Sequence, residues 1–346
     1  MPKKQEEEKR VLRKGLTTGV HATLAFSKAL EAFLITKEPS VTKINKIDND
    51  DLDVTKGCEI VINVSDKKAD LMVSEVEHKP QESSVGTNKL YIYAGIGVGV
   101  VTKKGLKISP DFPAINPVPL ENIQNVFLRQ VEEYHNLTIH CTVSVTNGEE
   151  IAKQTANSKV GVLGGISILG TSGIVKPVSS TAYIDSVKTE IEFAKQNGFE
   201  PLIFTLGNSA FRVSKERYVE EQIVEVANFV YDSIEIASQL EVKKVKFVCG
   251  IGKMTKVYQG FKNTHNRFGV IDFVLLQKHI EEELGYKVDI EATKTVKGIS
   301  QELDKIGLID DLYTMITRKA NEQIKEWFPK SNVEAIILEQ KEVTGW

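Results

Sequence analysis

The sequence predicts two domains: an N-terminal α+β domain with a mixed sheet over residues 1–155, and a C-terminal Rossmann-like parallel α/β domain over residues 156–346. Three observations support this. The chain has 346 residues, and domains run to roughly 100–200 residues each. Up to residue 155, strand and helix patterns follow one another without regular rhythm. After it, strand, loop and helix repeat, which is typical of a parallel sheet with crossover helices.

The composition is that of a soluble globular protein. Hydrophobic residues make up 41% and charged residues 26% of the chain, in the usual range. Lys and Arg number 44 against 47 Asp and Glu, a net charge of −3, so no nucleic acid or membrane partner is expected. No apolar run reaches the roughly 18 residues of a membrane span. Because the N-terminus mixes both signs of charge and has no apolar run, we do not expect it to be a signal peptide.

The cysteines indicate a reducing compartment. Cys58, Cys141 and Cys249 lie far apart and form no CxxC pair, which argues against a disulfide framework and against a zinc site. We therefore expect a cytoplasmic protein that holds no metal of its own. The oligomeric state stays open, and a homo-oligomer is compatible with the sequence.

The first domain begins, after a charged tail at residues 1–14, with the turn Gly15–Gly19 and a largely buried helix from about Val20 to Thr36. The clearest strand covers 137–145, where apolar and polar residues alternate as in a half-buried strand. The other expected elements are strands at 41–46, 58–64 and 90–93 and a helix at 120–135.

The turn before the first helix has two interpretations. Thr17 or Thr18 can cap the helix through its hydroxyl, or the helix N-terminus can bind a carboxylate or phosphate; the sequence does not decide between them. His21, in the first turn, is expected to be a neutral, hydrogen-bonded core residue. Asn49–Asp53 is expected to be a solvated acidic turn, since it lacks the glycine of a calcium loop.

The second domain is expected to follow a strand–loop–helix order. The predicted strands are 160–163, 201–206, 245–248 and 333–338. The predicted helical regions are 180–197, much of 215–240 with an interruption near 224–228, 272–284, 301–306 and 312–328.

The glycine-rich stretch from Lys159 to Pro177 stands out in this order. Gly164, Gly165, Gly170 and Gly173 are spaced along it, and such loops expose backbone N–H groups to anionic ligands. A tight turn in a parallel sheet is the alternative. Ligands of parallel sheets bind beyond the carboxyl ends of the strands. We therefore expect three loops to meet at one sheet end: 164–173, 207–209 and 250–253.

Few side chains carry obvious chemistry. His265 lies between Thr264 and Asn266, which can orient an imidazole for base chemistry or substrate binding, although a lone loop histidine is more often inert. Lys253 can meet an anionic group or be a solvated first-turn lysine. No Ser-His-Asp arrangement, HExxH or Walker lysine motif is present.

A set of short motifs is spread over nearly the whole chain. They are Gly15–Gly19, Asp53–Gly57, Gly97–Leu106, Pro113–Pro119, Gly164–Val175, Ile251–Lys253 and Asn263–His265. In their order and sequence these segments resemble the CbiD family, the cobalt-precorrin-5B C1-methyltransferases of anaerobic cobalamin biosynthesis.

The resemblance implies methyl transfer from S-adenosylmethionine to C1 of a ring-contracted cobalt corrinoid precursor, a tetrapyrrole. Cobalt would enter only with this substrate. We predict that His265 is the catalytic residue. The residues that we predict to bind the donor are Gly164, Gly165, Gly170, Thr171, Ser172, Gly173, Gly207, Asn208 and Gly252. The residues that we predict to bind the substrate are Thr17, Thr18, Lys103, Lys253 and Thr264.

The sequence also departs from the family pattern inside its motifs. The departures are Val20-His21, Ala94, Ile96, Gly250 and Asn266. They leave a second hypothesis open: a divergent, non-catalytic corrinoid- or nucleotide-binding member of the same fold.

Overall fold

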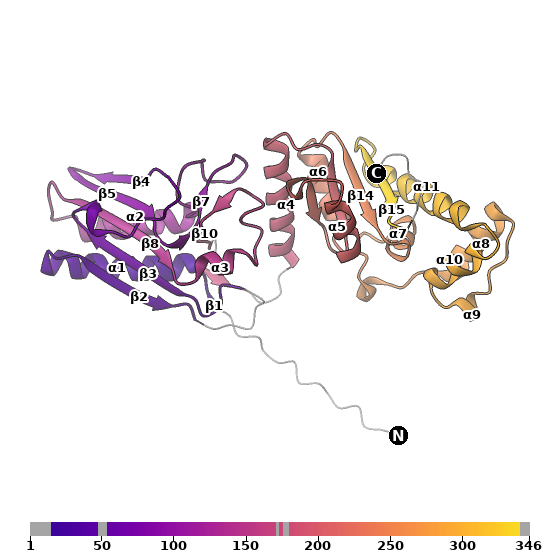
Figure 1. Ribbon diagram of the computed structural model, residues 1–346, viewed down its shortest axis with the longest axis horizontal. Coiled ribbons are helices and arrows are strands. Elements are labelled where there is room, and N and C mark those ends of the chain that lie inside the picture. Colours follow the sequence, from indigo (N-terminus) through magenta and orange to yellow (C-terminus); the bar gives the residue numbers. More distant parts are fainter. Residues whose placement is uncertain (1–14, 48–53, 171–172, 176–179, 340–346) are drawn as a thin grey trace, which may run out of the picture. The chain divides into compact units, whose positions relative to one another are not determined.

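The structure is a computed structural model of the chain. It describes residues 15–47, 54–170, 173–175 and 180–339. The chain divides into two compact units, Met1–Ser180 and Thr181–Trp346 (Figure 1).

A mixed sheet is the centre of the first unit. Among the described residues it has five strands, in the order β2-β3-β8-β5-β4. Strands β5 and β8 run parallel, and the other neighbouring pairs are antiparallel. The strands are β2 (Ser40–Asn45), β3 (Glu59–Ser65), β4 (Gln81–Val85), β5 (Asn88–Ala94) and β8 (Thr138–Val145).

Helices α1 (Thr18–Thr36) and α2 (Pro117–Gln130) pack with this sheet in one hydrophobic core. Alternate residues of β8, Ile139, Cys141 and Val143, are fully buried, and the predicted alternation is confirmed except at Thr142, which is fully buried as well. They share the core with Phe26 and Leu30 of α1. The helix begins at Thr18 rather than Val20 because Thr17 caps it.

The glycine-rich stretch belongs to the first unit. Strand β9 (Val162–Leu163) pairs with β7 (Val100–Val101), and β10 (Gly165–Ile166) pairs with β6 (Gly97–Val98). Strand β11 (Ile174–Val175) pairs with β1 (Gly15–Leu16). The short helix α3 (Gly148–Ala152) lies against β6 and β10.

These pairings correct two expectations. Residues 160–163 were expected in the parallel sheet of a second domain that starts at residue 156, but their partners are strands of the first unit. The boundary between the units therefore falls after Ser180. The stretch is held by segments about 60 to 160 residues away in the chain, and no local pattern encodes such pairing.

The sheet of the second unit is parallel, as expected from the strand–loop–helix order. In the described part of the chain its strand order is β13-β12-β14-β15. The strands are β12 (Leu202–Leu206), β13 (Ile223–Glu225), β14 (Val245–Cys249) and β15 (Val333–Ile337). Strand β13 lies where an interruption was expected, near 224–228, in the largely helical region 215–240. Residues 216–222 lack the α-helix that was also expected there.

Both faces of this sheet are covered. On one face, Ile203, Val248 and Ile336 pack with Ala210 of α5 (Asn208–Lys215). On the other, the main core combines strand residues with the helices. The remaining helices are α4 (Ser180–Gln196), α6 (Val230–Gln239), α7 (Ile251–Tyr258), α8 (Phe273–Leu284), α9 (Ile290–Thr293), α10 (Val296–Asp304) and α11 (Ile309–Trp327).

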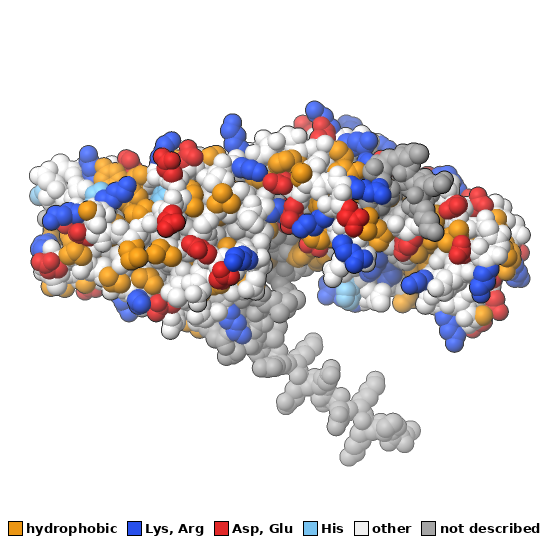
Figure 2. All heavy atoms as spheres, viewed as in Figure 1, with side chains coloured by type: hydrophobic (Ala, Val, Ile, Leu, Met, Phe, Trp, Pro, Cys, Tyr) orange, Lys and Arg blue, Asp and Glu red, His pale blue; other side chains and the backbone are white. Residues whose placement is uncertain are grey.

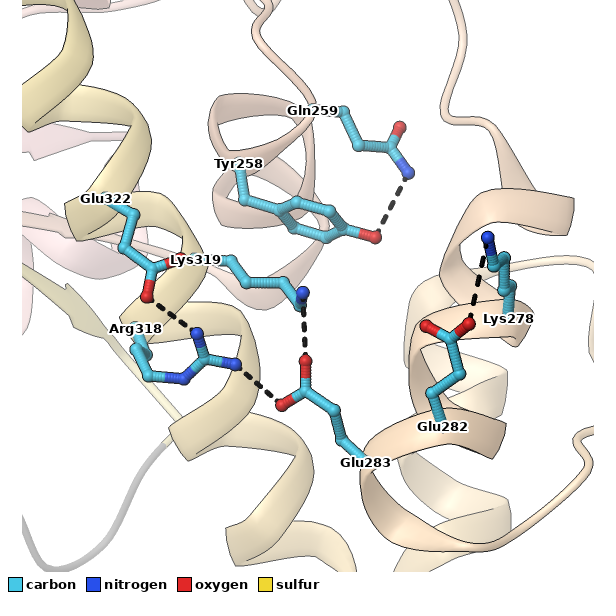
Figure 3. Close-up of polar contacts among 8 residues, drawn as sticks. All are labelled: Tyr258, Gln259, Lys278, Glu282, Glu283, Arg318, Lys319 and Glu322. Carbon is cyan, nitrogen blue, oxygen red and sulfur yellow. Dashed lines mark hydrogen bonds and ion pairs between the residues drawn. The ribbon is translucent and has the colours of Figure 1, made fainter.

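An ion-pair network joins α8 to α11 (Figure 3). The Glu283 carboxylate contacts Arg318 Nη2 at 2.6 Å and Lys319 Nζ at 2.9 Å, and Arg318 Nη1 also contacts Glu322 at 2.6 Å. Desolvation alone would raise the pKa of Glu283, but the hydrogen bonds from Lys319 and Arg318 outweigh it and lower that pKa.

The surface carries both signs of charge. On the face drawn in Figure 2, Lys and Arg side chains alternate with Asp and Glu over both units. Among the described residues, no helix combines the length and apolar character needed to cross a membrane. The acidic turn at 49–53 lies outside the described residues.

Candidate functional site

The carboxyl ends of β12 and β14 form the centre of the candidate site. These strands are neighbours in register, with Leu206 opposite Cys249. Strand β13 lies on one side of β12, and β14 lies on the other side. The order in which the chain adds strands to the sheet therefore reverses between β12 and β14. Open parallel sheets bind ligands at such a position.

Glycines follow both strands and leave space above their backbones. Gly207 has a φ of 96°, and a Cβ built there meets no atom within 4 Å. Gly252, in the first turn of α7, is equally open. The predicted loops 207–209 and 250–253 therefore lie at one sheet end, with Asn208 at the start of α5. A ligand can approach these backbones closely.

Glu339 occupies the start of α7. Its Oε2 accepts a hydrogen bond from the Ile251 N–H at 3.2 Å, and a Cβ at Gly250 would lie 3.2 Å from its Oε1. A carboxylate is favourable at a helix N-terminus. The sequence reasoning missed this residue, and the only signal was its place just after the predicted strand 333–338.

Two lysines of α7 reach the loop 263–269, with neutral oxygens as their hydrogen-bond partners in the described part of the chain. Lys253 Nζ donates to Asn228 Oδ1 and to the Thr264 carbonyl, both at 2.9 Å. Lys256, only 4% exposed, donates to the carbonyls of Thr264 and Gly269 and to a loop side chain.

Burial lowers the pKa of both lysines, and the charge of Lys256 lowers the pKa of Lys253 further. Buried cations are usually paired with an acid, whereas these two are satisfied by carbonyl and amide oxygens. A positively charged pair without a bonded carboxylate suits a site for an anionic ligand.

The loop beside these lysines carries the other predicted residues. Thr264 is fully buried and donates from Oγ1 to Asn228 Oδ1 at 2.8 Å. His265 is exposed, and its Nδ1 accepts from the Arg267 N–H at 3.2 Å. The proton of the neutral ring therefore lies on Nε2. Two predicted motifs are thus brought together, since Lys253 contacts Thr264, the residue before His265. Asn228 and Lys256 were missed.

The predicted residues of the first unit meet at a different place. Thr17 N donates to the Gly173 carbonyl at 3.1 Å, and Gly19 N donates to the Leu169 carbonyl at 2.8 Å. Thr17 Oγ1 caps α1 by accepting from Val20 N.

The Thr18 hydroxyl is also used within the protein. Its Oγ1 accepts from Leu169 N at 2.9 Å and lies 3.2 Å from the Leu169 carbonyl oxygen, to which it donates. Thr18 is 4% exposed. The capping interpretation of this turn is confirmed for Thr17, and the Thr18 hydroxyl is bonded to the backbone of Leu169.

The glycines of the long stretch are explained by close chain packing. A Cβ at Gly165 would lie 2.2 Å from the Gly97 backbone, and one at Gly170 would lie 2.1 Å from Thr17 Oγ1. This corrects the expectation that these backbones are open to a ligand. It also corrects the expected three-loop crevice, since 164–173 belongs to the first unit. Thr171 and Ser172 lie outside the described residues.

A pocket of about 270 Å³ lies beside this stretch. Its lining includes Gly164, Gly165, Glu149, Lys153 and Ser158. Small-molecule sites usually have about 300–1,000 Å³, so this pocket is small for a nucleoside-sized ligand.

The aliphatic stem of Lys103, another predicted residue of the first unit, packs beside Gly161. Among the described residues, no group of three metal-ligating side chains gathers.

Three departures from the family pattern have defined surroundings. His21 is 1% exposed; its Nδ1 donates to the Thr17 carbonyl and its Nε2 accepts from Ile47 N, so the neutral core residue is confirmed. Asn266 Oδ1 accepts from Lys256 Nζ at 2.9 Å. Gly250 leaves room for the Glu339 carboxylate.

Ala94 and Ile96 are the other two departures. Ala94 is fully buried, and its N–H donates to His78 Nε2 at 3.1 Å. Ile96 is 48% exposed. The departures are therefore accommodated in a consistent local structure.

Comparison with known proteins gives the family. The CbiD family model matches residues 37–177. A cobalt-precorrin-5B C(1)-methyltransferase of Methanococcus maripaludis is 33% identical over 310 residues, covering 88% of this chain and 81% of the relative. The enzyme of the same name from Methanocaldococcus jannaschii is 32% identical over 301 residues, covering 85% and 78%.

Among solved structures, a cobalamin biosynthesis protein (CbiD) from Archaeoglobus fulgidus matches at 23% identity and a TM-score of 0.33, covering 68% of this chain and 76% of that one. The identity to curated relatives extends over both units. The chain therefore belongs to the CbiD family.

Proposed function

We propose that the protein is a methyltransferase of cobalamin biosynthesis that transfers a methyl group from S-adenosylmethionine to C1 of cobalt-precorrin-5B. The observation that carries this proposal is the 33% identity over 88% of the chain to a relative named for that reaction. The donor supplies an activated methyl on sulfonium sulfur, so the protein mainly has to align donor and ring carbon.

The methyl donor is assigned to the second unit, which we take to be Rossmann-like. The support is the direction change between β12 and β14 and the open backbone at Gly207 and Gly252, where a nucleoside can lie against the chain. Asn208 adds a side-chain amide at the start of α5. For Gly165 and Gly170, which pack against other segments, we propose a structural role instead.

The macrocycle is assigned to Lys253, Thr264 and His265. Its carboxylates complement the lysine pair on α7, and the Nε2–H of the exposed His265 can donate to a substrate oxygen or carry a proton. Lys103 is proposed as a further carboxylate contact. Thr17 and Thr18 are proposed to act indirectly, by fixing the first turn of α1.

The state of the cysteines supports a proposal about the cellular compartment. Cys58, Cys141 and Cys249 are buried and form no disulfide among the described residues, which fits a reducing cytoplasm. Cobalt is proposed to enter only inside the substrate.

Donor titration tests the assignment of the donor site. S-adenosylmethionine is titrated calorimetrically into the wild type and into the variants Gly252→Ala and Gly252→Val. The three proteins differ only in the size of one side chain, which points into open space. We expect Gly252→Ala to bind nearly as the wild type and Gly252→Val to lose at least about tenfold in affinity, or 1.4 kcal/mol.

Two results would redirect the proposal. Equal affinity of the valine variant would remove the donor from this loop. No donor binding to the wild type, with or without corrinoid, would favour the non-catalytic binding member.

A further inference from the structure

The loop 263–269 presents an aromatic and a cationic side chain to solvent. Phe268 is 55% exposed, and the guanidinium carbon of Arg267 lies 4.6 Å from its ring centroid. Val270, two residues further on, is 75% exposed. Large apolar side chains that are exposed next to one another often mark binding surfaces.

This exposed pair stands on a firmly held loop. Three hydrogen bonds from buried Lys256 and one from Lys253 fix its carbonyls and the side chain of Asn266. Gly269, with a φ of 143°, packs so tightly that a Cβ would lie 2.3 Å from the Phe261 ring. The turn that exposes the Phe268 ring is therefore held in place by hydrogen bonds and close packing.

The charge around the pair selects the kind of ligand. Arg267 adds a positive charge to the two α7 lysines, whose hydrogen-bond partners in the described part of the chain are neutral oxygens. An aromatic ring beside a guanidinium matches a flat π-system that carries carboxylates at its edge. A cobalt-precorrin has this chemistry.

We propose that Arg267 and Phe268 form a platform for the tetrapyrrole substrate, with a face of the macrocycle on the Phe268 ring and a peripheral carboxylate on Arg267. Both are binding residues next to His265, which lies directly before this turn. This inference rests on the proposed function and adds the residues that orient the ring.

Corrinoid titration separates the two contributions. The probes are cobyrinic acid, which carries free carboxylates, and its methyl ester, which keeps the ring without those charges. We expect Phe268→Ala to raise the Kd for both probes about tenfold, the scale of a lost stacking contact. Arg267→Ala should raise it about tenfold for the acid only.

Ile35→Ala is the matched control, because Ile35 is a 76% exposed apolar residue of the first unit. It should leave both Kd values unchanged. The affinity for S-adenosylmethionine and the thermal midpoint should stay at wild-type values in all three variants, which shows that each is folded.

The outcomes distinguish this inference from the proposed function. Unchanged corrinoid affinity and unchanged KM for cobalt-precorrin-5B in Phe268→Ala would overturn the platform, and so would a wild type that binds neither probe; methyl transfer would still stand. A wild type that binds both probes through these residues but transfers no methyl group would overturn the function and leave the platform.

Discussion

Replacing Lys256 by Met tests whether a buried cation organises the substrate side of the site. The change removes donors from the Thr264 carbonyl at 3.2 Å and from Asn266 Oδ1 and the Gly269 carbonyl at 2.9 Å each. Each hydrogen bond from a charged donor contributes about 1.5–3 kcal/mol. Met recovers part of this because it needs no desolvation. Asn266 is exposed and Gly269 half-buried, so water can replace the lysine at these two residues, and we expect a net loss of about 2–4 kcal/mol.

Urea unfolding followed by tryptophan fluorescence measures this loss. Both tryptophans, Trp327 and Trp346, belong to the second unit, so the signal follows that unit. Lys262→Met is the control, since Lys262 is exposed and its Nζ lies 4.1 Å from the centroid of the Tyr231 ring. This substitution should lower the free energy of unfolding by less than about 1 kcal/mol.

Trypsin provides a second measurement on the same variants. Cleavage after the exposed Arg267 should become faster in Lys256→Met than in the wild type or the control. If the stability and the cleavage rate of Lys256→Met both matched those of the control, the loop would not depend on this lysine and the reasoning would be wrong.

Two further predictions concern the frame around the site. Gly170→Ala should destabilise the first unit by about 2–4 kcal/mol, because φ is 147° and the Cβ would overlap Thr17; Gly198→Ala, with φ 75° and free space, should cost only about 1 kcal/mol in urea unfolding. Glu283→Gln should cost about 1 kcal/mol at pH 7. Since the two cations in Figure 3 lower the folded-state pKa of Glu283, its contribution is present above the unfolded pKa of about 4.3 and is lost as pH falls through the folded pKa. Unfolding midpoints of variant and wild type that stay apart at pH 2 would contradict this.

Local patterns predicted the elements that depend on local burial. Strand β8 was predicted because one face is buried and the other is polar, and β12 and β14 because both of their faces are covered. The stretch 160–175 was placed in the wrong sheet, because an apolar run followed by glycines is compatible both with the parallel sheet of the second unit and with the short strand pairs of the first. Its partners, β6 and β7, lie far back in the chain.

The candidate site was predicted where a motif lies in one loop. Lys253, Thr264 and His265 came from short segments of the sequence, and the structure joins them through one carbonyl, that of Thr264. Asn228 and Glu339 reach the site from the residues after β13 and β15. Their roles depend on strand order, which a single sequence does not specify.

Anaerobic turnover with an isotope-labelled methyl donor tests whether the protein methylates C1 of the corrinoid. The protein is incubated with cobalt-precorrin-5B and S-adenosylmethionine labelled on the methyl carbon, and the corrinoid is analysed by mass spectrometry and carbon NMR. We expect one labelled methyl group on C1 and an equal amount of S-adenosylhomocysteine. An unmodified corrinoid, or a label on another carbon, would show that the proposed reaction is wrong.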